Sequence, residues 1–287
     1  MKFVSFRAAG RSRYGLVIRT GIVDLTKHRS EPDLKSLIAA DGLAAAANAH
    51  QDDKPDYRLD EVQFDALIPN PDKIICIGLN YFEHRNETGM TEHARPAIFT
   101  RFADTQIGHL DAVVRPKASE ELDYEAELAI VIGKGGRYIK ESEALAHIAG
   151  YSCYNDVSVR DYQRHASQWL PGKNFPATGP FGPFLVTPGE VGPLKGKKIQ
   201  TRVNGNTMQS STLDMMIFSP AQLIEYISGF TPLYPGDVIA TGTPGGVAWV
   251  RKPPPWMKPG DTVEVEIDGV GLLKNSIVAE DRGGGSA

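Results

Sequence analysis

Short runs of apolar and β-branched residues, separated by turn residues, recur along the chain and predict many short strands. The N-terminal runs of this kind lie at Phe3–Phe6, Tyr14–Ile18 and Ile22–Leu25. A stretch with Leu34, Leu37 and Ile38 at helical spacing follows them. The next segment, 51–71, is polar and contains three prolines. We therefore interpret residues 1–70 as a small α/β domain with its linker.

The same strand pattern continues over residues 71–280 and predicts a larger, β-rich domain there. Asn204-Gly205 predicts a two-residue hairpin turn, because both turn positions need a positive φ that these residue types tolerate, and Asp268-Gly269 marks a final hairpin. Helices are fewer; Ser219-Pro220-Ala221-Gln222 predicts an N-cap, an N1 proline and a capping box for a helix that ends at Gly229. The Gly/Ser-rich residues 281–287 are expected to form a flexible tail.

Composition and charge exclude several classes of protein. Hydrophobic residues make up 41% and charged residues 23% of the 287 positions, as in ordinary globular chains. The net charge of −4 comes from basic and acidic residues that are mixed along the chain, so neither nucleic acid nor an anionic membrane is an expected partner. Cys76 and Cys153 stand singly in apolar runs, which favours buried thiols over a disulfide framework. A cytoplasmic protein is the expectation.

The segment Leu122–Ile132 carries two carboxylates in an otherwise apolar strand pattern. In a single strand, Glu125 and Glu127 would share one face, and burying both is costly unless a cation compensates. An edge strand facing solvent is the competing interpretation, and Glu-x-Glu alone favours it. Asp156, at the end of the next apolar strand, shifts the balance. Three carboxylates with open positions suit Mg²⁺ or Mn²⁺.

The residues behind Asp156 have helical spacing. Arg160 and Gln163 are i,i+3 neighbours, so both can lean toward whatever Asp156 holds, and an arginine there suits a substrate carboxylate. A solvated helix face is the alternative. Lys173 lies in a loop dense in glycine and proline. A surface lysine is the default at such a position, whereas in a concave metal-containing loop it would stabilise a developing enolate.

A second polar cluster follows the apolar run 74–77. His84 and Glu87 are i,i+3 neighbours in a short helical segment, close enough for a hydrogen bond that would raise the basicity of the ring. Such a pair can activate water. A polar surface helix is equally consistent with this spacing.

Taken in order, these motifs resemble the fumarylacetoacetate hydrolase family, in its short branch of acylpyruvase-like and 2-hydroxyhepta-2,4-diene-1,7-dioate isomerase-like enzymes. The likeness extends from Lys73 to Glu280. The matching pieces are Gly78-Leu79-Asn80-Tyr81 with His84 and Glu87, Asp123-Tyr124-Glu125-Ala126-Glu127, Asn155-Asp156 with Arg160 and Gln163, Gly172-Lys173-Asn174-Phe175, Val203-Asn204-Gly205 and Thr241-Gly242-Thr243-Pro244.

The resemblance implies a mixed α+β, β-rich fold, a β-sandwich or roll with a small N-terminal α/β domain, in a homodimer. It implies site roles as well. The metal ligands would be Glu125, Glu127 and Asp156; His84 and Glu87 would activate water from a lid; Lys173 would stabilise an enolate; and Arg160, Gln163, Thr243 and Tyr81 would bind a small keto-acid substrate. The larger N-terminal domain and fourth acidic ligand of the long-form enzymes have no clear equivalent here, so fumarylacetoacetate itself is not the expected substrate.

The function predicted on this basis is metal-dependent hydrolysis of a C–C bond in a 2,4-diketo acid, with release of pyruvate or a related 2-keto acid. Decarboxylation of an oxaloacetate-type acid, isomerisation of a 2-hydroxy-dienoate and dehydration of a sugar acid remain alternatives on the same site. The presence of both His84 and Glu87 favours the hydrolase or the decarboxylase over the isomerase. A non-catalytic metal-binding or calcium-stabilised scaffold also remains open.

Overall fold

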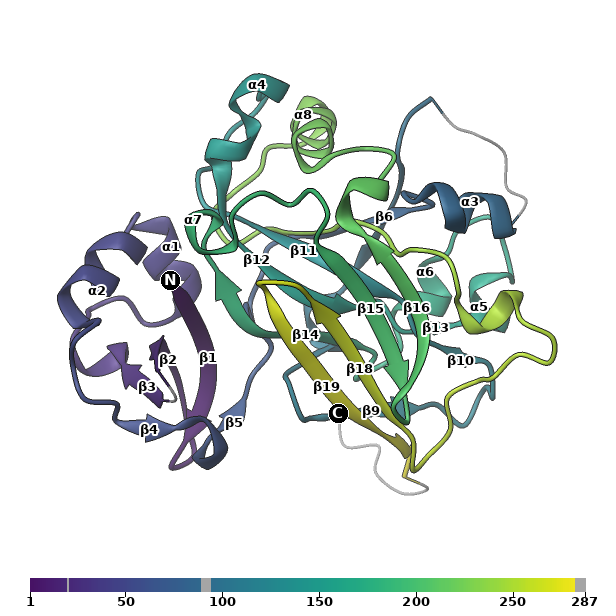
Figure 1. Ribbon diagram of the computed structural model, residues 1–287, viewed down its shortest axis with the longest axis horizontal. Coiled ribbons are helices and arrows are strands. Elements are labelled where there is room, and N and C mark those ends of the chain that lie inside the picture. The colour runs from purple at the N-terminus through teal and green to yellow at the C-terminus, as the bar shows by residue number, and fades with distance from the viewer. Residues whose placement is uncertain (20, 89–93, 282–287) are drawn as a thin grey trace.

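The computed structural model describes residues 1–19, 21–88 and 94–281, so the predicted tail lies, apart from Asp281, outside the described residues. Two sheets dominate this part of the chain (Figure 1). The strands of the larger, twelve-stranded sheet are β1 (Lys2–Ala8), β2 (Arg11–Ile18), β3 (Gly21–Asp24), β4 (Tyr57–Arg58), β5 (Gln63–Phe64), β6 (Ile74–Gly78), β7 (Ala97–Arg101), β8 (Gln106–Ile107), β11 (Ala126–Ile132), β12 (Ile148–Asn155), β14 (Gly179–Val186) and β17 (Val238–Ala240).

A five-stranded sheet faces the middle of the large one, and two further strands form a short separate ladder (Figure 1). The five strands are β9 (Ala112–Arg115), β15 (Lys198–Val203), β16 (Asn206–Thr212), β18 (Thr262–Ile267) and β19 (Gly271–Ala279), and the ladder pairs β10 (Leu122–Asp123) with β13 (Ser158–Val159). The helices are α1 (Leu34–Ala39), α2 (Leu43–His50), α3 (Phe82–Thr88), α4 (Glu141–Ala144), α5 (Arg160–Gln163), α6 (Leu170–Lys173), α7 (Pro188–Val191) and α8 (Pro220–Phe230).

The core forms on both faces of β11, all seven residues of which are buried. Leu128 and Ile130 pack with Val265 and Leu273 of the five-stranded sheet, so this face closes a β-sandwich. Ala129 and Val131 face the opposite way, into a second cluster with residues of β1, β2 and α1. The predicted β-rich α+β sandwich is confirmed. None of the described helices is long and apolar enough to cross a membrane.

The N-terminal strands are continuous with the large sheet, because β1 pairs with β2 on one side and with β14 on the other. The division after residue 70 therefore stays a prediction about domains, whereas the hydrogen-bonded sheet runs across it. Cys76 and Cys153 are buried free thiols, as the sequence indicated.

Local signals of the turns and caps are confirmed. Asn204 and Gly205 have φ values of 51° and 78° in the turn between β15 and β16. Ser219 and Gln222 form the predicted capping box at the start of α8, and that helix ends one residue later than expected, at Phe230.

The prediction of one continuous strand over 122–132 is wrong. The ladder of β10 ends at Asp123, and β11 begins at Ala126. The interruption has a local cause: Asp123 Oδ1 accepts the N–H of Tyr124, and the N–H of Glu125 donates to the side chain of Asn155 at 3.0 Å. Side-chain acceptors thus replace the ladder at these two residues.

Candidate active site

Strand register brings the three predicted metal ligands together. Ala126 pairs with Asn155 in the β11–β12 ladder, so Glu125 and Asp156 lie opposite each other one step beyond it, with the N–H of Asp156 donating to the Glu125 carbonyl at 3.0 Å. Glu127, two residues along, reaches the same point. Oxygens of Glu125, Glu127 and Asp156 all lie within 4.8 Å of one another, and all three residues are buried. The competing interpretation of a solvent-facing edge strand is therefore wrong.

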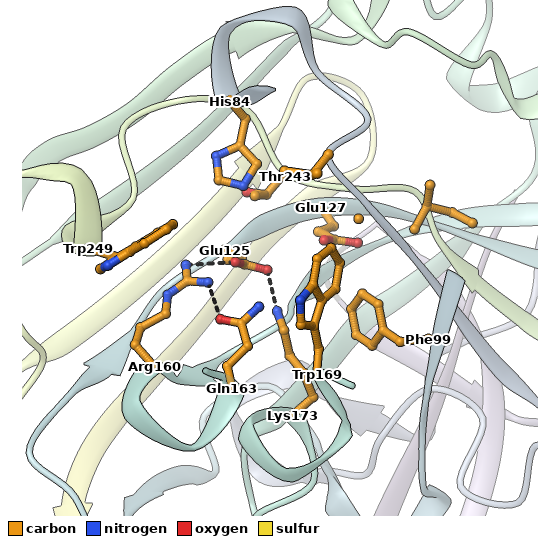
Figure 2. Close-up of a pocket in the computed structure, with 13 residues that line it drawn as sticks. His84, Phe99, Glu125, Glu127, Arg160, Gln163, Trp169, Lys173, Thr243 and Trp249 are labelled. Atoms are coloured by element: carbon orange, nitrogen blue, oxygen red, sulfur yellow. Dashed lines mark hydrogen bonds and ion pairs between the residues drawn. The ribbon is translucent and has the colours of Figure 1, made fainter. Parts of the chain in front are cut away.

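Three buried cations surround two of these carboxylates. Lys173 Nζ lies 2.6 Å from Glu125 Oε2 and 2.7 Å from Asp156 Oδ2. Arg160 Nη2 lies 2.7 Å from Glu125 Oε1 (Figure 2). On the side of β7, Arg101 Nη1 donates to Asp156 Oδ1 at 2.6 Å. Glu125 and Asp156 are thus each paired with two cations.

Glu127 is the exception. The polar partner that the structure gives its side chain is the backbone N–H of Gly242, which donates to Oε2 at 2.9 Å. Burial, reinforced by the carboxylates of Asp156 and Glu125, raises the pKa of Glu127 well above its ordinary value. Burial acts on Glu125 in the same direction, but Lys173 and Arg160 outweigh it and lower the pKa of Glu125 to about 2.

The difference between Glu127 and the other two carboxylates is consistent with a divalent cation site. Within the described residues Glu127 forms no ion pair, and a buried carboxylate of this kind, within reach of two others, is what a bound metal ion would neutralise. All the donors are carboxylate oxygens, the set that Mg²⁺ and Mn²⁺ prefer. The residues present therefore fit the metal that the sequence predicted, with Glu125, Glu127 and Asp156 as its protein ligands.

His84 and Glu87 form the predicted pair on α3. His84 Nδ1 lies 2.8 Å from Glu87 Oε1, while the other oxygen of Glu87 accepts the N–H of Gly246 at 2.8 Å. Glu87 is therefore fixed from the far side and orients the ring. Because this contact occupies Nδ1, any proton transfer by the ring toward the carboxylate cluster would use Nε2 of His84. Figure 2 shows the imidazole above Thr243 and facing the cluster.

Thr243 is held by a residue that the sequence analysis missed. Gln209 of β16 donates from Nε2 to Thr243 Oγ1 and to the Pro244 carbonyl, each at 2.8 Å. Its amide oxygen accepts the N–H of Ala126 at 2.9 Å. Because the Thr243 hydroxyl accepts from Gln209, its own proton is available to a ligand. A buried glutamine in an alternating strand carries no sequence signal that would have revealed this role.

Arg101 and Asp123 were missed as well. Asp123 Oδ2 accepts from Arg160 Nε at 2.8 Å and from the backbone N–H of Trp249 at 3.0 Å, so it fixes the arginine and the loop beside it. Arg101 holds Asp156 from behind and also donates to Thr178 Oγ1 at 2.6 Å. A lone charge in the apolar run Ala97–Phe102 was the available sequence signal for Arg101.

A narrow cavity of about 30 Å³ opens onto the cluster. Its polar lining consists of His84, Glu125, Glu127, Arg160, Gln163, Lys173 and Thr243, all of which the sequence predicted for the site. Tyr81 does not line it. That side chain is fully buried in the core beneath α3, and its hydroxyl has no hydrogen-bond partner in the described structure, so its predicted contact with substrate stays a prediction.

Comparison with known proteins agrees with this geometry. The family model for the fumarylacetoacetate (FAA) hydrolase C-terminal domain matches residues 73–278. The mitochondrial oxaloacetate tautomerase FAHD2A of Bos taurus is 46% identical over 220 residues, which cover 76% of this chain and 70% of that protein.

Two solved structures share the fold over 98% of this chain and 100% of their own. The fumarylacetoacetate hydrolase of Exiguobacterium antarcticum has a TM-score of 0.84 at 33% identity. The maleylpyruvate hydrolase of Sphingobium sp. SYK-6, in complex with manganese(II) and pyruvate, has a TM-score of 0.82 at 28% identity. The chain belongs to the fumarylacetoacetate hydrolase family, whose members include hydrolases, isomerases and enzymes that act on oxaloacetate.

Proposed function

We propose that this chain is a divalent-metal-dependent oxaloacetate tautomerase, which interconverts the enol and keto forms of the acid. The observation that carries the proposal is the placement of Lys173, whose ammonium group lies within 2.7 Å of both Glu125 and Asp156 at the floor of the cavity. A cation at this point stabilises the negative charge of an enolate, which both tautomers share on deprotonation. The relative at 46% identity, named as an oxaloacetate tautomerase, supports the choice of substrate.

Separate residues of the cavity would bind the two ends of the substrate and stabilise its negative charge. A bound Mg²⁺ or Mn²⁺ would act as a Lewis acid toward the keto-acid end of the substrate. Arg160 and Gln163, which hydrogen-bond each other at 2.8 Å, present a guanidinium and an amide to the far carboxylate. Lys173 donates to the C2 oxygen as negative charge develops there. Arg160 Nη2 lies 2.7 Å from Glu125 Oε1, so the guanidinium that would meet the substrate is held in place by the carboxylate cluster.

Proton transfer completes the reaction. In the direction of ketonisation, the enol O–H gives its proton to His84 Nε2, the C2–O bond becomes a carbonyl, and a proton passes from His84 Nε2 to C3, so the compositions of the substrate and of the enzyme are unchanged. His84 Nε2, oriented through Nδ1 by Glu87, is the group that carries a proton at C3. The buried position of His84 keeps bulk water from competing for that proton.

The loss of the enol's ultraviolet absorbance in freshly dissolved oxaloacetate tests the proposal. The wild-type enzyme with Mg²⁺ or Mn²⁺ is expected to speed this loss well above the rate in buffer, and EDTA should remove the acceleration. Lys173→Ala should reduce the rate to near that of buffer, whereas Lys195→Ala, a change at an exposed lysine, should not. A wild-type rate equal to that of buffer with either metal would exclude the tautomerase.

Hydrolysis of a 2,4-diketo acid is the second candidate, and the His84–Glu87 pair is the observation that favours it. Here His84 would deprotonate a water that adds to C4; the C3–C4 bond then breaks, and its electron pair forms the enolate of pyruvate beside Lys173. The products are a carboxylic acid and pyruvate, which lactate dehydrogenase and NADH detect. The same coupled assay with oxaloacetate separates decarboxylation from tautomerisation, because only decarboxylation yields pyruvate.

A further inference from the structure

A second compartment of about 250 Å³ lies directly outside the catalytic cavity. The two share four lining residues, Arg160, Gln163, Trp169 and Trp249, so the outer space is the continuation of the inner one toward solvent. Figure 2 shows the indoles of Trp169 and Trp249 on opposite sides of the Arg160–Gln163 pair. A ligand that extends past this pair therefore enters a space bounded by two aromatic rings.

Both indoles are held in place by the protein. Trp169 lies edge-on to Phe99, with ring centroids 5.6 Å apart, and covers Gly78 so closely that a Cβ there would lie 2.1 Å from the indole. The backbone N–H of Trp249 donates to buried Asp123 at 3.0 Å, and the Arg164 guanidinium lies over the Trp249 ring. The walls are thus in place before a ligand arrives, which lowers the entropic cost of binding.

The polar groups at the rim are already paired. Arg164 lies over the Trp249 ring, 5.6 Å from its centroid, and its Nη2 lies 2.7 Å from Glu121. The pair has no net charge, so the outer compartment does not attract a second anion strongly. Aromatic walls beside a neutral rim favour a flat, uncharged group over a carboxylate.

The substrate of the proposed reaction leaves this space unused. In a four-carbon keto diacid the second carboxylate already ends at Arg160 and Gln163, which stand at the boundary of the two spaces. An apolar cavity of about 150 Å³ is enough to hold benzene. The outer compartment, at about 250 Å³, has room for a phenyl ring with its connecting carbonyl.

We propose that this compartment, between Trp169 and Trp249, binds the aryl or extended planar group of longer 2,4-dioxo acids whose keto-acid end occupies the catalytic cavity. The proposal rests on the proposed function for the position of the keto-acid end. It makes Trp249 a specificity-determining residue, because this indole forms the wall opposite Trp169.

Two ligands that differ only in the far group test the assignment: 2,4-dioxopentanoate, which ends in methyl, and 4-phenyl-2,4-dioxobutanoate, which ends in phenyl. Their dissociation constants are measured by calorimetry on the Mg²⁺-loaded enzyme, so the result does not depend on turnover. The wild type should bind the phenyl compound at least tenfold more tightly than the methyl compound. Trp249→Ala should reduce this preference to threefold or less, and Trp249→Phe should retain most of it.

Trp256 provides a matched control, because it belongs to the same segment but packs on the core cluster of β9 and β18 and lines neither space. Trp256→Ala should keep the full phenyl preference. An equal affinity of the wild type for both compounds, or a preference that survives Trp249→Ala, would overturn the proposal. A wild type that shows the preference but does not accelerate enol loss would refute the tautomerase and leave the compartment assignment standing.

Discussion

Replacing Arg101 with methionine tests whether the carboxylate cluster depends on a buried cation that never meets the substrate. Arg101 contributes a fully buried guanidinium that contacts Asp156 Oδ1 and Thr178 Oγ1, each at 2.6 Å, and it lies outside the catalytic cavity. Methionine keeps much of the side chain's volume and removes its charge. The change leaves Asp156 with Lys173 as its remaining cationic partner.

The expected loss in the free energy of unfolding follows from these buried contacts of Arg101. Removing one partner of a buried ion pair destabilises a protein by about 3–5 kcal/mol, because the other charge stays buried without compensation. The contact that Lys173 keeps with Asp156 places Arg101→Met near the lower end, at about 3 kcal/mol. Against a typical unfolding free energy of 5–15 kcal/mol, such a loss is readily measured.

Urea unfolding of the metal-free proteins, followed by circular dichroism, measures the difference in the free energy of unfolding between the wild type and Arg101→Met. Adding Mg²⁺ should narrow it, because a bound cation compensates the carboxylate that Arg101 compensated before. Arg101→Lys should lose less than Arg101→Met, and Asp156→Asn added to Arg101→Met should recover part of the loss, since the uncompensated charge is then gone. Wild-type stability of metal-free Arg101→Met, or a gap that Mg²⁺ does not change, would refute the reasoning.

Three further changes probe separate parts of the molecule. Glu127→Gln removes the carboxylate that forms no ion pair with any described residue, so the Mn²⁺ affinity measured by calorimetry should fall at least tenfold while the metal-free protein stays as stable as the wild type. An unchanged affinity would exclude Glu127 as a ligand. His84→Ala should slow enol-oxaloacetate conversion by about 10²–10⁴-fold and leave Mn²⁺ affinity intact, whereas a rate close to that of the wild type would remove His84 from proton transfer. Burial, with a smaller effect of Lys274, lowers the pKa of His109 to about 4, so the unfolded chain gains a proton before the folded one and stability should fall as pH drops from about 6.5 toward 4. His109→Gln should weaken this acid sensitivity in thermal melts, and an identical pH profile would contradict the assignment.

Much of the fold could be predicted because its signals are local. A turn such as Asn204-Gly205 needs positive φ values that few residue types accept, and the capping box at Ser219 satisfies backbone groups only at a helix start. The interruption between Asp123 and Ala126 was missed for the opposite reason. This interruption depends on the side chain of Asn155, which accepts the N–H of Glu125 although the two residues are distant in sequence.

In the site as well, residues with a local sequence signal could be predicted, whereas residues that act through distant partners could not. Glu125, Glu127 and Asp156 stood out because carboxylates interrupt apolar strands. Arg101 and Gln209 did not, because each acts through another side chain across the sheet. Such supporting residues carry ordinary polar side chains whose importance appears only when their partners are placed.

One constellation can serve tautomerisation, isomerisation and C–C cleavage because these reactions share an enolate and differ in what reaches it. In the proposed mechanism, Lys173 would stabilise that enolate in every case. The outcome then depends on whether a proton or a water molecule meets the reacting carbons. The inner cavity, at about 30 Å³, holds roughly two waters when empty. A short diacid bound at the cluster would displace those waters and leave a proton on His84 to react with the enolate, which favours tautomerisation. A longer 2,4-dioxo acid that places its far group between Trp169 and Trp249 would bring C4 to the boundary of the two spaces, where a water beside His84 can attack.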